Sequence, residues 1–190
     1  MHALIRPAVM GLLIFTVLTG LIYSLVVTGI AQLVFSSQAN GNLIVANGQT
    51  VGSTLIGQSF DDPRYFWGRI SATGLFSNNA ATSSVSNFGP INPALLGIVQ
   101  SRIDALRAAD PGNLASILVD LVTASGFGLD PNISVAAALY QIPRVVKERG
   151  LSETEVRAQV DQNTQERQFG FLGEPRVNVL LLNLALDEIK

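Results

Sequence analysis

The chain has 190 residues, of which 48% are hydrophobic and only 14% are charged, whereas a typical soluble domain has about 25% charged residues. The formal net charge of −2 argues against nucleic acid as the main partner, because that binding requires a basic face. There is no cysteine, and the single histidine, His2, stands at the N-terminus. Disulfides, thiolate chemistry and a histidine relay further along the chain are therefore excluded, and we expect no catalytic residue and no metal site.

The first predicted element is a membrane-spanning helix over residues 8–35. Residues Ala8 to Phe35 form a near-continuous apolar run, and no charged residue occurs between Pro7 and Phe60. As a helix this run would reach about 42 Å, which exceeds the roughly 30 Å of a bilayer core. A cleaved signal peptide is the alternative, because residues 37–39 resemble a small-x-small cleavage site. Signal sequences have apolar regions of only about 7–15 residues, so we favour an uncleaved anchor.

The distribution of basic residues predicts the orientation of this helix. Arg6 precedes the apolar run, and the first basic residue after it is Arg64. Positive residues favour the cytoplasmic side. We therefore expect a cytoplasmic N-terminus (1–7), a linker (36–48) and an extracytoplasmic domain (49–190).

Small residues recur every four positions along the predicted span, at Thr16, Gly20, Ser24 and Thr28. Such a stripe allows a second membrane helix to approach closely, so these four residues are candidates for docking a partner helix. The alternative is that small residues are simply common in membrane helices.

Two polar stretches separate the predicted elements of the outer domain. The linker, 36–48, is rich in Asn and Gly and leads into a first strand. Residues 71–92 are rich in Ser, Asn and Gly and show no periodicity. At about twenty residues this stretch is too long for an idle connection, so we expect it to be functional, docked on a partner or disordered.

Capping signals predict the first helices of the domain. Asn92 followed by Pro93 opens a helix, which residues 110–112 (DPG) end. Residues 117–123 (ILVDLVT) are β-branched and short, and predict a strand. Ser134 begins a helix that is interrupted at Pro143 and resumes until Gly150 stops it.

The remaining chain predicts two more helices. Ser152 and Glu155 form a capping box for a helix that runs to about Asn163. Residues 170–175 are a turn-rich loop, and 177–189 are mostly helix with Asn178 as the N-cap. Several helices with a few short strands indicate a mixed α+β domain behind a single N-terminal transmembrane helix.

The residue types available limit the chemistry. A Walker A motif is excluded, because Lys147 precedes Glu148 and the other lysine, Lys190, is the last residue. The Gly-x-Gly at 126–128 predicts a tight turn and not a dinucleotide site. A carboxylate pair could serve a glycosidase, so a membrane-anchored extracytoplasmic hydrolase remains the alternative function. Nothing in the sequence brings two of its candidate carboxylates together, and these are Asp61, Asp62, Asp120, Asp130 and Glu174.

Several ordered motifs together resemble one family. They are GSTLIGQSF (52–60), YFWGRISA (65–72), SNFGPINP (86–93), DLVTASGFGLDP (120–131), YQIPRV (140–145), GEPRVNVL (173–180) and LNLALD (182–187). The set is similar to KdpC, the C subunit of the bacterial Kdp potassium-transporting P-type ATPase, over nearly the whole chain.

The resemblance implies a function and a set of partners. The partners would be a channel-like K⁺ subunit (KdpA), a P-type ATPase subunit that carries the catalysis (KdpB) and a small single-span subunit (KdpF), in the bacterial inner membrane. The implied role is a non-catalytic accessory subunit that assembles the complex and raises the ATPase subunit's affinity for ATP, as a catalytic chaperone. Family members are often credited with ATP binding themselves.

Direct ATP binding conflicts with the predicted orientation, because cytoplasmic ATP would meet only about seven residues of this chain. ATP and K⁺ would then belong to the complex, no nucleotide-binding residue can be named, and any effect on ATP affinity would be allosteric.

Charged residues of the domain suggest one further role. Carboxylates over a K⁺ entrance could raise the local cation concentration, and the candidates are Asp61, Asp62, Asp130, Asp187 and Glu188. The alternative is that they are caps or ordinary surface charges. Arg69, Arg144 and Arg176 are expected to form structural ion pairs or interface contacts.

Overall fold

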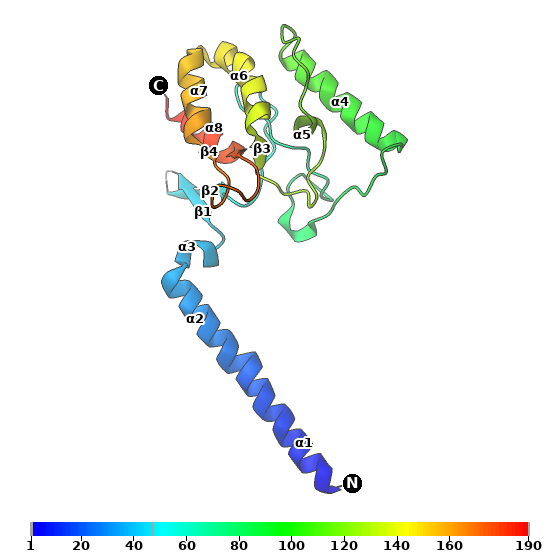
Figure 1. The fold of residues 1–190 in the computed structure, drawn as a ribbon, viewed down its shortest axis with the longest axis vertical. Helices are drawn as coiled ribbons and strands as arrows, with labels where there is room; N and C mark the ends of the chain where they lie inside the picture. Colours follow the sequence, from blue (N-terminus) through cyan, green and yellow to red (C-terminus); the bar gives the residue numbers. More distant parts are fainter. Residues whose placement is uncertain (1, 47, 190) are drawn as a thin grey trace. The chain divides into compact units, whose positions relative to one another are not determined.

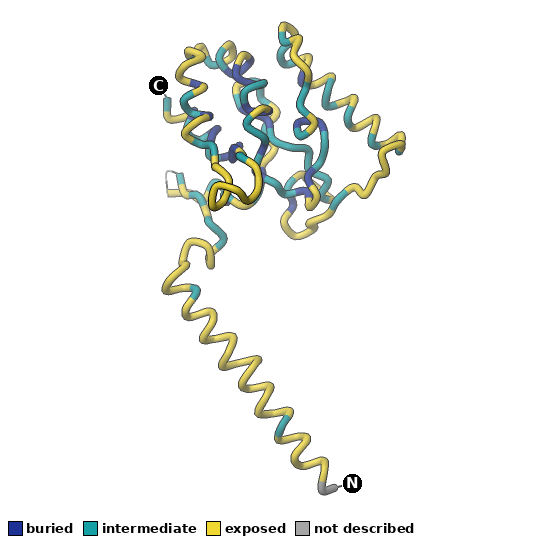
Figure 2. Tube along the Cα trace, viewed as in Figure 1, coloured by how far each residue is buried: buried dark blue, intermediate teal, exposed yellow. Residues whose placement is uncertain are grey.

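The computed structural model describes residues 2–46 and 48–189 and divides the chain into two compact units, one up to Val51 and one from Gly52 onward. The first unit is built on one long helix (Figure 1). Its parts are α1 (His2–Phe15), a π-helical segment η1 (Thr16–Tyr23) and α2 (Ser24–Val34). The helical segment Leu4–Val34 is long enough and apolar enough to cross a membrane. Its residues are almost all exposed (Figure 2).

Two hydroxyl groups accompany the change to π-helical winding. Thr19 Oγ1 donates to the carbonyl of Phe15 at 2.6 Å, and Ser24 Oγ donates to the carbonyl of Thr19 at 3.3 Å. Both hydroxyl groups thereby donate to backbone carbonyls in the part of the helix where the winding changes.

The segment that we interpret as a linker, 36–48, contains regular structure. A helical turn, α3 (Ser36–Ala39), is followed by β1 (Leu43–Ala46), which pairs with β2 (Gln49–Ser53) in a two-stranded sheet. The first strand therefore begins before residue 48.

The second unit is a mixed α+β fold, as predicted. Its sheet has the order β3 (Asn132–Ser134), β5 (Arg176–Asn178), β4 (Thr164–Gln165), and both pairings are antiparallel. Val177, in the central strand, lies opposite Ile133 and Thr164 and is fully buried. Helices α6 (Val135–Arg149), α7 (Glu153–Gln162) and α8 (Val179–Asp187) pack together beside this sheet (Figure 1).

Local capping signals are confirmed at four helix starts. The side chains of Asn92, Ser134 and Asn178 each accept a bond from the first turn of their helices, and Ser152 forms the complete capping box with Glu155. At its other end, α6 stops at Gly150, whose φ of 68° is left-handed.

The strand predicted at 117–123 is wrong. This stretch holds a short helix, α5 (Val119–Val122), with Leu121 and Val122 buried. Thr123 Oγ1 donates to the carbonyl of Val119 at 2.8 Å, and Asp120 accepts from the backbone N–H of Ser134 at 2.7 Å. These bonds favour the helical turn over the β propensity of the residues.

The predicted interruption at Pro143 is also wrong, because α6 runs through it. Proline removes one helical hydrogen bond, but its neighbours Ile142, Arg144 and Val145 are all buried. Burial of this helix face therefore holds α6 together across the proline.

The long polar stretch 71–92 is docked on the chain itself. It contains η2 (Ala80–Thr82) and leads into α4 (Pro93–Ala109). Ser71 Oγ donates to the carbonyl of Gly128 at 2.7 Å, and Ser83 Oγ donates to that of Phe127 at 3.1 Å. Gly128 has a φ of +77°, and a Cβ there would lie 2.8 Å from the Ser84 carbonyl oxygen and from Thr73 Cγ2. The turn predicted at 126–128 thus receives this stretch.

Candidate functional site

The best-defined feature of the second unit is its central segment, Pro63–Gly68, which crosses the core. Phe66 is 0% exposed and Trp67 is 5% exposed. No backbone pairing with a strand is found for this segment in the described chain. Because buried backbone groups must be hydrogen-bonded, side chains have to supply the partners.

Two buried carboxamides take the place of neighbouring strands. Asn183, on α8, accepts from the N–H of Phe66 at 2.8 Å and donates to its carbonyl at 3.0 Å. Gln141, on α6, makes the same pair of bonds to Trp67, at 2.8 Å and 3.1 Å. Successive residues of an extended chain point in opposite directions, so two helices can each clamp one residue.

The indole of Trp67 makes cation–π contacts with two arginines. The guanidinium carbons of Arg102 and Arg144 stand 4.9 Å and 4.8 Å from its ring centroid. Arg144 also donates to the carbonyls of Pro63 and Tyr65 and to Gln141. Burial lowers the pKa of Arg144 to about 10, and it also lowers the pKa of Arg102.

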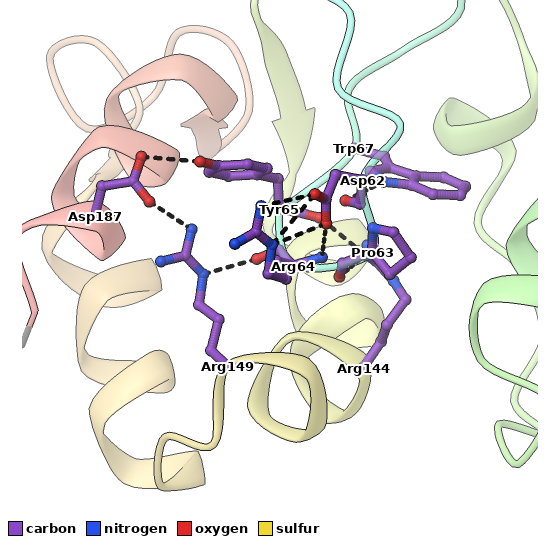
Figure 3. A network of polar contacts seen from close by, with 8 residues as sticks. All are labelled: Asp62, Pro63, Arg64, Tyr65, Trp67, Arg144, Arg149 and Asp187. Atoms are coloured by element: carbon purple, nitrogen blue, oxygen red, sulfur yellow. Dashed lines mark hydrogen bonds and ion pairs between the residues drawn. The ribbon is translucent and has the colours of Figure 1, made fainter.

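A polar network links the central segment to α6 and α8 (Figure 3). Arg149 donates to the carbonyl of Arg64 at 2.8 Å and pairs with Asp187 at 2.8 Å. The hydroxyl of Tyr65 donates to the same carboxylate at 3.1 Å. Arg64 pairs with Asp62 at 2.9 Å, and its hydrogen bonds hold the pKa of that carboxyl below the usual value.

The structure separates the five carboxylates that were proposed to attract cations into two groups. Asp62, Asp130 and Asp187 form ion pairs with arginines, Asp130 with Arg69 at 3.3 Å. Asp61 and Glu188 form no ion pair within the described residues; Asp61 is exposed, and Glu188 follows the end of α8. Asp62 and Asp187 belong to the polar network of Figure 3, whereas Asp130 pairs with Arg69. No group of three or more potential metal ligands occurs in the part of the chain that the structure describes.

The arginines singled out from the sequence have different environments. Arg69 pairs with Asp130 and donates to the carbonyl of Ala124 at 3.0 Å. Arg144 bonds carbonyls and Gln141, as described above, while Arg176 donates only to Gln165, at 3.1 Å on the surface.

The small-residue stripe of the long helix is exposed at all four positions, Thr16, Gly20, Ser24 and Thr28. In an α-helix, residues four apart are rotated by about 40° relative to each other around the helix axis. A stripe with this spacing therefore moves gradually onto another face of the helix. The π-helical segment η1 has more residues per turn and contains the first two of these positions. It therefore counters the drift and keeps the stripe on one face.

A cleft of about 710 Å³ lies along one side of α4. The helix contributes Ala94, Gly97, Ile98, Ser101, Arg102 and Ala105, and the facing chain contributes Gln58–Asp61, Gly68–Ser71 and Ser77. Arg102 holds α4 against the domain by donating to the carbonyls of Gly68 at 2.9 Å and Leu121 at 3.1 Å.

The sequence reasoning did not single out Gln141, Asn183 or Arg102. A local signal exists for Asn183, which stands alone as a polar residue within the apolar run VLLLNLAL. Buried polar side chains are hydrogen-bonded, so such a residue indicates a specific partner, although not which one.

Comparison with known proteins gives consistent matches. The family model described as "K+-transporting ATPase, c chain" (KdpC) matches residues 5–188. A potassium-transporting ATPase KdpC subunit from Herpetosiphon aurantiacus is 60% identical over 190 residues, covering 100% of this chain and 98% of the relative. Proteins of the same name from a Janthinobacterium species (58%, covering 99% and 100%) and from Methylococcus capsulatus (59%, covering 97% and 97%) are similarly close.

Proposed function

The chain belongs to the KdpC family, the c chains of K⁺-transporting ATPases, and from this membership we propose that it is a non-catalytic accessory subunit of an ATP-driven potassium-uptake complex. The observation that carries the proposal is the extent of the match, which includes both the apolar helix and the outer domain. A function that used only one of these parts would not require similarity over both.

We propose that the protein spans the bacterial cytoplasmic membrane once, with its N-terminus in the cytoplasm. Arg6 is the only side chain before the apolar run that carries a fixed positive charge. Since the chain contains no cysteine, one introduced thiol tests the orientation. Ala108→Cys, on exposed surface of α4, should react with a membrane-impermeant maleimide in intact cells, and labelling only after lysis would reverse the topology.

The long helix is proposed to be the docking element within the membrane. Its stripe, Thr16 to Thr28, offers a smooth exposed face, and helices pack closely in lipid where side chains are small. The channel-like K⁺ subunit KdpA, the ATPase subunit KdpB and the small subunit KdpF are the proposed partners of the complex.

The effect on ATP affinity is proposed to be allosteric. With the domain outside, cytoplasmic nucleotide cannot contact it, so any coupling must pass through the membrane subunits. Coupling between binding sites is reciprocal. If this chain raises the complex's ATP affinity tenfold, ATP must strengthen the association of the chain by the same factor.

The experiment compares the purified complex with and without this subunit. We expect tighter equilibrium ATP binding when the chain is present, and no ATP binding to the isolated full-length chain at the same concentrations. Binding of ATP to the chain alone with the affinity of the complex would refute the allosteric proposal.

The cation-attraction hypothesis narrows to Asp61 and Glu188, because the other three carboxylates are already paired with arginines. Replacing both with amides should weaken the apparent K⁺ affinity of transport if they attract cations. An unchanged affinity would remove this role.

A further inference from the structure

The cleft beside α4 is uncovered along most of the helix that forms its wall. Ala94, Gly97, Ile98 and Ser101 are all exposed. The core contacts of α4 lie on its other side, where Leu106 is buried and Val99 and Ile103 pack against the core cluster. The cleft face therefore contributes little to the packing of the domain itself.

The residues of α4 that line the cleft have mostly small side chains, which leave the cleft open. A Cβ added at Gly97 would meet nothing within 4 Å, and glycine inside a helix costs about 1 kcal/mol relative to alanine. The stability of α4 would thus gain from a larger residue here. The glycine leaves space in the cleft that the fold of the domain does not require.

Arg102 gives the same cleft a positive charge. Arg102 donates to two carbonyls, although a guanidinium has five N–H donors. It forms no ion pair with the described residues. The other arginine of the cleft, Arg69, is already paired with Asp130. A partly buried guanidinium with unused donors favours a carboxylate, which can accept two of them at once.

We propose that this cleft is a docking site for an acidic loop of a partner protein in the potassium-transport complex, with an Asp or Glu side chain placed against Arg102. The inference rests on the proposed function for the existence of the partner. Charge complementarity identifies the occupant, because Arg102 lines the cleft, has unused N–H donors and forms no ion pair with the described residues. Asp61 lines the rim of the same cleft and would exclude a second acidic group, which restricts the register of the loop.

Thiol protection tests whether the cleft is occupied. Ser101→Cys places a unique thiol in the cleft, and Ala108→Cys places a matched thiol on exposed surface of α4 outside it. In the assembled complex we expect alkylation at position 101 to slow by about tenfold or more relative to the free full-length chain, as in a solvent-excluded interface, with no change at position 108. Equal rates at position 101 in a complex that still co-purifies would overturn the inference while leaving the proposed function intact.

Carbodiimide coupling tests the charge of the occupant. Ser101→Lys introduces an amine beside Arg102, and a zero-length carbodiimide joins an amine only to a carboxylate in contact with it. We expect an amide bond to an Asp or Glu of a partner subunit, identified by mass spectrometry, and none from the control Ala108→Lys. Coupling only to Asp61 of the same chain, or no coupling in the intact complex, would overturn the acidic occupant.

Blocking the cleft gives an independent readout. Gly97→Leu fills the open space without a contact inside the domain, and Ala108→Leu adds the same side chain elsewhere on α4. The first variant should reduce the chain's retention in the complex, and the second should not. Full retention of Gly97→Leu would overturn the docking site.

Discussion

Replacing Asn183 with alanine should destabilise the compact unit that begins at Gly52 more than any single surface change would. Asn183 is 1% exposed, and Phe66, which it clamps, is 0% exposed. The variant removes both bonds, of 2.8 Å and 3.0 Å, and leaves a backbone N–H and a carbonyl without partners in the core.

The magnitude follows from the two orphaned groups. Each buried and unsatisfied polar group costs about 1–3 kcal/mol, so Asn183→Ala should lower the free energy of unfolding by about 2–6 kcal/mol. A matched change at an exposed carboxamide, Gln162→Ala at the end of α7, should alter it by no more than about 0.5 kcal/mol.

Trp67 provides the assay, because it is the only tryptophan, is 5% exposed and lies next to the clamped residue. Its fluorescence should report denaturant unfolding of the full-length chain in detergent. If the unfolding midpoint of Asn183→Ala equals that of Gln162→Ala, the carboxamide clamp does not hold the central segment in place.

Three further predictions follow from glycine positions and from one ion pair. Gly128→Ala should destabilise the docked stretch 71–92 and speed its proteolysis, because the new Cβ meets atoms at 2.8 Å, whereas Gly74→Ala, with open space around it, should not. Gly20→Leu should reduce co-purification of the membrane subunits, while Gly11→Leu, on another face of the same helix, should leave it unchanged. Asp62 has a folded pKa below its usual 3.8 because of Arg64, so its stabilisation is present above that pH and is lost as the pH falls through the folded value. The difference in unfolding midpoint between the wild type and Asp62→Asn should therefore be present at pH 7 and vanish in acid, and a constant difference would contradict this account.

What could be predicted from the sequence was mainly local. The caps at Asn92, Ser134, Ser152 and Asn178 depend on residues within one helical turn, so their signals are complete in the sequence. The long apolar helix could be predicted equally well, because a candidate span is recognised by its length and apolar composition alone.

The features that were predicted wrongly or missed depend on contacts between residues far apart in the sequence. The helix at 119–122 is supported by Asp120 bonding Ser134, and α6 continues through Pro143 because its face is buried. The clamps on Phe66 and Trp67 span 117 and 74 positions of sequence. No local pattern shows which helix supplies the partner of a buried backbone group.

The most direct test of the central claim is a mild-detergent pull-down of the tagged full-length chain from its native membrane, with the ratio of co-purifying proteins measured. We expect a P-type ATPase subunit and a large channel-like potassium subunit to co-purify in fixed ratio to this chain. Recovery of the chain alone would contradict the accessory-subunit function and would reopen the alternative of a membrane-anchored extracytoplasmic hydrolase.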